Sequence, residues 1–121
     1  MLWSKTLLLS AGLFLSASGV HATSTICPSY PSAQDKTHAL SDASLFVGPP
    51  KELVELMPDS DQETVWTLPD YQDEAKEHKT SLYFICHYKN TKQTVELIVA
   101  ATAKKCSVGY DKHSKVIAKC E

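Results

Sequence analysis

Residues 81–101, SLYFICHYKNTKQTVELIVAA, carry the strongest structural signal of the chain. The run from Ser81 to Lys89 is rich in aromatic and β-branched residues, and a second apolar run extends from Thr94 to Ala101. The short polar segment Asn90-Thr91-Lys92 between them is typical of a hairpin turn. Because both runs are apolar on both faces, we expect them to be neighbouring, central strands of an antiparallel sheet.

Shorter strand-like runs surround this hairpin at 43–47, 63–68, 105–110 and 115–120, each bounded by proline, glycine or polar residues. After Pro50, apolar residues at helical spacing over 53–57 predict a helix of one or two turns that ends at Pro58. Residues 70–80 are almost wholly polar and charged, which predicts a long exposed connection. The expected fold class is α+β or mainly β: a small antiparallel sheet of about five strands with one short helix, stabilised by disulfides.

The N-terminus has the three parts of an export signal. Lys5 supplies the positive charge, Leu7 to Leu15 the apolar stretch, and Val20-His21-Ala22 a small-x-small cleavage site. We therefore expect a signal peptide at 1–22 and a single disulfide-containing periplasmic domain at 23–121. No later segment approaches membrane-spanning length, so we expect no membrane insertion after cleavage.

Four cysteines follow the predicted cleavage site: Cys27, Cys86, Cys106 and Cys120. An even number of cysteines in an oxidising compartment predicts two disulfides, for which three pairings exist. Cys106 and Cys120 occupy mirrored positions around the last predicted turn and are able to face each other across a hairpin. Cys27 would then tie an extended N-terminal arm, residues 23–44, to the central strand through Cys86. The other two pairings stay open at this stage.

Two metal sites are alternatives to this interpretation. A zinc site is suggested by the even spacing of Cys106, His113 and Cys120, but the chain has no Cys-x-x-Cys clip. The acidic residues from Asp59 to Glu63 resemble the start of a calcium loop, but threonine stands where the sharp turn of that loop needs glycine. We expect no metal and no cofactor.

Catalytic chemistry is not indicated either. The histidines are not accompanied by a Gly-x-Ser-x-Gly elbow, and Cys86 and His87 are adjacent on a predicted strand, so their side chains point to opposite faces. The acidic residues cluster in polar, exposed segments, where the raised pKa of a general acid is not expected. We predict that the protein is not an enzyme and has no catalytic residue.

Charge is distributed unevenly along the chain. Nine acidic residues and two lysines lie between Lys51 and Glu77, a balance of −7, whereas residues 78–121 contain eight lysines and three acidic residues, a balance of +5. The chain contains no arginine, which is the preferred side chain for binding phosphate groups and base edges. Nucleic acid is therefore excluded as an expected partner.

The acidic segment contains the candidate partner-binding residues. These are Asp59, Asp61, Glu63, Asp70, Asp73, Glu74 and Glu77. Carboxylates on a rigid sheet domain are suited to a basic protein partner, such as an enzyme that binds the anionic cell wall, because opposite potentials speed encounter and orient the complex. The alternative is that these charges only keep the segment solvated.

A set of short motifs runs in order along the chain. They are Cys27-Pro28, Gly48-Pro49-Pro50, Leu56-Met57-Pro58-Asp59, Trp66, Cys86-x-Tyr88-x-x-Thr91, Cys106-x-Val108 and Cys120. Together they resemble a family of small exported proteobacterial proteins with four cysteines, some encoded near type VI secretion genes and peptidoglycan-attacking effectors. The resemblance covers most of residues 23–121 and implies a periplasmic immunity protein that inhibits such an effector by binding it. The alternative is a structural or ligand-binding envelope protein without a toxin partner.

Overall fold

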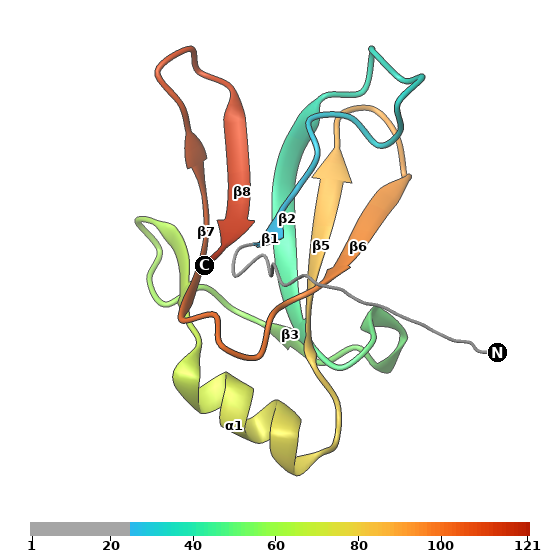
Figure 1. Cartoon of the computed structure of the whole chain (residues 1–121). Helices are drawn as coiled ribbons and strands as arrows, with labels where there is room; N and C mark the ends of the chain where they lie inside the picture. The colour runs from blue at the N-terminus through green and yellow to red at the C-terminus, as the bar shows by residue number, and fades with distance from the viewer. Residues whose placement is uncertain (1–24) are drawn as a thin grey trace, which may run out of the picture.

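The computed structural model describes residues 25–121, which form two four-stranded antiparallel sheets and one α-helix (Figure 1). The helix lies across one end of the sheets, and the hairpin turns project at the other end. The predicted signal peptide, residues 1–22, lies outside the described residues, so its cleavage stays a prediction.

The strands alternate between two sheets as the chain advances. The first sheet has the order β1 (Thr25–Ile26), β8 (Val116–Cys120), β7 (Lys105–Tyr110), β4 (Thr64–Thr67). The second has the order β3 (Glu55–Leu56), β2 (Leu40–Val47), β5 (Leu82–Tyr88), β6 (Thr94–Ile98). A 3₁₀ turn, η1 (Pro50–Glu52), and the helix α1 (Pro69–Glu77) lie in the connections. The predicted fold class, mostly β with one helix and two disulfides, is confirmed for residues 25–121.

The hairpin that dominates the sequence is β5 and β6, which pair from Tyr83–Ile98 to His87–Thr94. β5 lies between β2 and β6 and is buried along most of its length, as expected for a central strand. The expectation that both strands are central is wrong for β6, which is an edge strand whose Ile98 is 62% exposed. The chain leaves the second sheet after β6 and crosses to β7 of the first, so β6 keeps one partner within residues 25–121.

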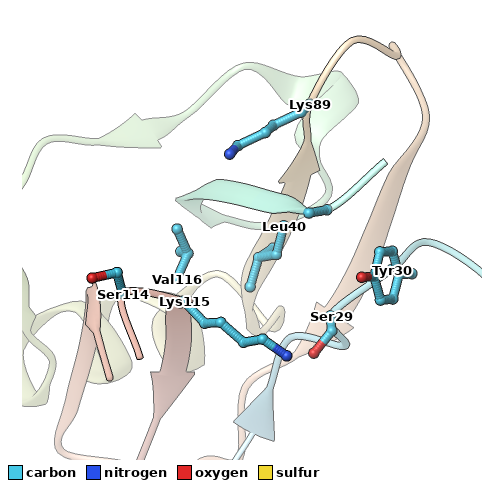
Figure 2. A pocket seen from close by; sticks show the side chains of 8 residues that line it. Ser29, Tyr30, Leu40, Lys89, Ser114, Lys115 and Val116 are labelled. Carbon is cyan, nitrogen blue, oxygen red and sulfur yellow. The ribbon is translucent and has the colours of Figure 1, made fainter. Parts of the chain in front are cut away.

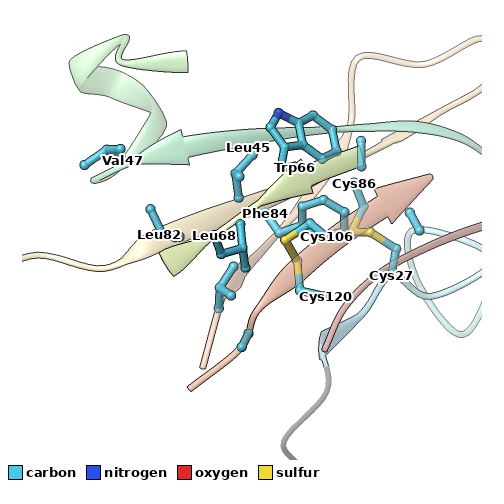
Figure 3. Close-up of a cluster of buried hydrophobic side chains, with 14 of the residues drawn as sticks. Cys27, Leu45, Val47, Trp66, Leu68, Leu82, Phe84, Cys86, Cys106 and Cys120 are labelled. Atoms are coloured by element: carbon cyan, nitrogen blue, oxygen red, sulfur yellow. A yellow bond between two sulfur atoms is a disulfide. The ribbon is translucent and has the colours of Figure 1, made fainter. Parts of the chain in front are cut away.

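The core fills the space between the two sheets (Figure 3). Trp66 of β4 and Phe84 of β5 meet there edge to face, with 6.1 Å between ring centroids. The indole N–H of Trp66 donates a 2.9 Å hydrogen bond to the carbonyl of Leu56 in β3, so a residue of the first sheet also fixes the edge of the second. The side chains of Leu45, Leu68 and Leu82 complete the fully buried centre.

Both disulfides have the pairing that the mirrored cysteine positions favoured. Cys27 is bonded to Cys86 and Cys106 to Cys120, so no thiolate remains for the zinc alternative. Cys106 and Cys120 lie directly opposite each other on β7 and β8. The next pair along, Lys105 and Glu121, exchanges both backbone hydrogen bonds, which makes the cysteine pair a non-hydrogen-bonded one, where opposed side chains come closest.

The helix predicted over 53–57 is not formed. Pro50 begins only the 3₁₀ turn η1, and the chain then pairs with β2 as the short strand β3, where Leu56 lies opposite Leu45. The helical spacing was misleading because Leu53 and Met57 are 81% and 76% exposed and share no buried face. The backbone of this segment instead completes the edge of a sheet.

The helix lies instead where an exposed connection was predicted, at residues 69–77 of α1. Pro69 occupies the start of the helix, where its missing N–H costs nothing, and the helix ends in a Schellman motif in which Thr80 N–H bonds the carbonyl of Ala75. Ala75 is the buried residue of the helix, so the sequence has no apolar stripe to reveal it. Hydrogen bonds from the Gln72 amide to the carbonyls of Ala100 and Ala103 hold the helix to the loop before β7.

Removing one disulfide at a time should destabilise the protein by different amounts. The Cys27–Cys86 bridge spans a sequence separation of 59, and the Cys106–Cys120 bridge spans 14. Because loop-closure entropy grows with loop length, we expect losses of about 4 kcal/mol for Cys27→Ala/Cys86→Ala and about 3 kcal/mol for Cys106→Ala/Cys120→Ala. Urea unfolding of the two double variants measures both losses. A larger loss for the shorter loop would contradict the expectation.

Candidate functional site

The carboxylates singled out by charge gather on two neighbouring elements. Asp70, Asp73, Glu74 and Glu77 belong to α1, and Asp59, Asp61 and Glu63 belong to the loop that connects β3 to β4. All seven are exposed. The two elements meet where β4 runs into α1, since Asp59 and Asp70 line one hollow of about 400 Å³ together with Thr67 and Tyr71. We call α1, η1 and the loop 57–63 the acidic end of the molecule.

The helix arranges its four carboxylates on a single face. Positions 70, 73, 74 and 77 have the spacing i, i+3, i+4 and i+7, which places side chains along one side of an α-helix. Ala75 and Gln72, which hold α1 to the protein, occupy the opposite side. We call these four residues the acidic stripe. The alignment of these charges was not predicted, although their spacing together with Pro69 at the start of the segment indicates it.

Asp59 has a structural task that the other loop carboxylates do not share. One oxygen of its side chain accepts hydrogen bonds from the N–H of Thr67 at 3.0 Å and from the hydroxyl of Thr67 at 2.6 Å, and its own N–H donates to the carbonyl of Val65. These bonds fasten the loop to β4 and occupy the carboxylate that the calcium interpretation required as a first ligand. Asp59 therefore shapes the acidic end as well as adding charge to it.

A groove of about 520 Å³ separates η1 from the C-terminal end of α1. It is lined by Val47, Pro49, Glu52, Val54, Glu74, His78, Lys79 and Thr80. Two carboxylates, Glu52 and Glu74, thus share one depression although they are far apart in sequence. Glu52 was not among the predicted partner-binding residues, because no local sequence signal indicates that η1 and α1 lie together. Asp73 lines a different hollow on the other flank of α1, beside Lys76 and residues 98–102.

Several lysines lie at the opposite end of the molecule. Lys89 lies at the end of β5, and Lys112 and Lys115 lie in the turn between β7 and β8, at the end of the molecule away from α1 (Figure 1). Figure 2 shows Lys89 and Lys115 at a cavity of about 150 Å³ that is also lined by Tyr30 and Leu40. Other lysines of residues 78–121 lie close to the acidic end: Lys79 lines the groove beside η1, and Lys105 pairs with Thr67 of β4. The charge difference along the sequence is therefore only in part a difference between the two ends of the protein.

Two of the histidines, His38 and His87, form separate polar pairs. His87 Nε2 lies 2.8 Å from the hydroxyl oxygen of Ser44, while the neighbouring Cys86 points into the core, so the expected opposite orientation of Cys86 and His87 is confirmed. His38 Nδ1 lies 2.7 Å from a carboxylate oxygen of Asp35. The serine and the aspartate contact different histidines, so neither pair is part of a Ser-His-Asp arrangement.

Two ionisable groups near the N-terminal arm have shifted pKa values. Hydrogen bonds to the Asp35 carboxylate, first from the N–H and then from the ring of His38, lower the pKa of Asp35 to about 2. Burial raises the pKa of the Tyr88 hydroxyl, which donates to the carbonyl of Pro28. Tyr88 thereby holds the arm to the second sheet, whereas Asp35 fixes a turn within the arm, and both groups lie outside the acidic end.

Within residues 25–121 no cluster of three or more histidine, cysteine, aspartate or glutamate side chains is placed to hold a metal ion. No helix of this described part has the length and apolar character needed to cross a membrane.

Comparison with known proteins gives one match. The family model described as "Type VI secretion system Tli immunity protein" matches residues 33–121. The matched segment contains β2 to β8, α1, three of the four cysteines and all seven predicted carboxylates. Searches of curated proteins and of solved structures return no significant match.

The two roles of the loop carboxylates can be separated by mutation. Asp59→Ala removes an acceptor of two hydrogen bonds and should lower the free energy of unfolding by about 1 kcal/mol. Asp61→Ala removes an exposed carboxylate of the same loop and should change it by less than about 0.5 kcal/mol. Urea unfolding of both variants measures the difference, and equal values would show that the Asp59 bonds contribute nothing to stability.

Proposed function

The chain belongs to the type VI secretion system Tli immunity protein family, and from this premise we propose that it is a periplasmic, non-enzymatic immunity protein that binds and occludes its effector through the acidic end. The observation that carries the choice of surface is the acidic stripe, four carboxylates on one face of a helix that projects from the end of the sheets (Figure 1). The partner that fits this surface is a basic protein.

The acidic stripe lowers the stability of the isolated protein, which supports a role in binding a partner. Carboxylates three and four residues apart on a helix repel one another by a few tenths of a kcal/mol per pair. Glu77 also lies in the last turn of α1, where the helix dipole disfavours negative charge. Solvation alone does not require charges in this arrangement, whereas a basic surface of an effector would relieve the repulsion.

A periplasmic location is supported by the chemistry of the cysteines. All four are oxidised in pairs, and such bridges form and persist in an oxidising compartment such as the periplasm. The export signal predicted at 1–22 provides the route. An effector that reaches the periplasm of a neighbouring cell would meet the protein there.

The nature of the effector is the more detailed part of the proposal. A basic surface helps an enzyme to bind the anionic cell wall. A peptidoglycan-degrading effector with such a surface would be complementary in charge to the acidic end. A structural envelope protein without a toxin partner remains the alternative function, and it predicts no protection against any effector.

Protection in cells tests the role directly. A host that exports the effector encoded next to this gene should lyse, and coexpression of the full chain should restore growth, whereas the chain without residues 1–22 should not. Lysis that is equal with and without the full chain would contradict the immunity role. Released muropeptides and released fatty acids are measured in the same cultures. Fatty acids without muropeptides would refute the peptidoglycan part and leave the immunity role intact.

Association kinetics test the surface. Glu74→Gln/Glu77→Gln should slow association with the effector about tenfold at low ionic strength, and the difference should shrink as salt rises, because exposed charges are screened over about 8 Å at physiological ionic strength. The matched control Asp42→Asn/Glu96→Gln changes the net charge equally but on strands β2 and β6. Stopped-flow measurements compare both. Equal slowing by the two variants would show that net charge alone matters.

A further inference from the structure

Leu53 has an unusual combination of backbone conformation and exposure. It follows η1 with φ 62° and ψ 28°, the left-handed region, and its side chain is 81% exposed. Branched L-residues are disfavoured there because Cβ approaches the following carbonyl oxygen, whereas glycine and asparagine are tolerated. Among the positive-φ residues other than glycine in the described chain, the rest are Lys79, Asn90 and Ser114, so Leu53 is the apolar one.

The fold does not use the Leu53 side chain. The turn is closed by the N–H of Leu53, which donates to the carbonyl of Pro50 at 2.9 Å, and any residue with an N–H makes this bond. The side chain lies outside the buried core. Strain without compensating contacts is characteristic of residues kept for function.

Two further exposed apolar residues follow Leu53 in the chain at the edge of the second sheet. Val54 and Met57 are 43% and 76% exposed and lie within four residues of it in the chain. We call Leu53, Val54 and Met57 the apolar edge. Pro49, Pro50 and the turn bond restrict the backbone that presents it, so little conformational entropy would be lost when a partner covers it.

Carboxylates border the apolar edge. Glu52 and Glu55 flank Leu53 and Val54 in the sequence and are exposed. Val54 also lines the groove whose walls carry Glu52 and Glu74 together with Lys79, and Glu74 belongs to the acidic stripe. The apolar edge is therefore continuous with the acidic end. This combination fits an apolar pocket with lysine or arginine side chains at its rim.

We propose that Leu53 is the anchor of the effector interface: its side chain enters an apolar pocket of the effector, and Glu52, Glu55 and Glu74 pair with basic residues at the rim of that pocket. This inference rests on the proposed immunity function and adds to it the contact that holds the complex, whereas the acidic stripe governs its formation. Charge at the rim acts on association, and a buried anchor acts on dissociation.

The test uses substitutions for which stability and binding respond in opposite directions. Leu53→Asn suits the left-handed backbone, so the midpoint of thermal unfolding should stay or rise by a few degrees, while dissociation from the effector encoded next to this gene should become at least tenfold faster. Leu53→Met keeps an apolar side chain and should stay within threefold of the wild-type dissociation rate. Tyr110→Thr removes a similarly exposed side chain, 77% against 81% for Leu53, from the end of β7 away from α1, and should leave binding unchanged.

Each outcome decides between the claims. If Leu53→Asn dissociates from the effector at the wild-type rate, Leu53 is not the anchor. If Glu74→Gln/Glu77→Gln slows association in the same experiments, the proposed function stays in place. A lowered unfolding midpoint of Leu53→Asn would show that the leucine serves the fold and would overturn the inference. A wild-type protein that does not bind the effector would overturn both this inference and the proposed function.

Discussion

Trp66 joins the two sheets, and the position of the acidic end depends on it. Its ring packs edge to face against Phe84 of the second sheet, and its N–H bonds the carbonyl of Leu56 in β3. β3 and β4 are thereby held at one side of the protein, so both ends of the loop 57–63 are fixed and α1 begins at a defined place after β4.

The acidic end combines weak local stability with strong external constraints. α1 buries one alanine and carries repelling charges, so its own sequence contributes little to its formation. The helix is stabilised instead by Pro69 at its start, by the Gln72 hydrogen bonds and by the Schellman motif at its end. The result is a charged surface with a fixed backbone, which would lose little conformational entropy when a partner binds.

In the proposed complex, charge and apolar contact have different roles. Long-range attraction between the acidic stripe and a basic effector would increase the rate of encounter. The apolar edge would act only at contact distance, where it removes water. A protein that must neutralise a toxin before damage occurs needs both fast formation and slow dissociation of the complex.

The sequence by itself determined most of the strands and favoured one cysteine pairing, because both depend on local signals. The apolar runs at 81–89 and 105–110 specify β5 and β7, and mirrored cysteines around a turn favour the second bridge. The seven carboxylates were visible as a charge imbalance. Tertiary structure alone decided that 53–57 forms a sheet edge and that 69–77 forms a helix. Both segments are held by distant partners, Val47 and Leu45 for the first and the carbonyls of Ala100 and Ala103 for the second, and these contacts leave no trace in a short window of sequence.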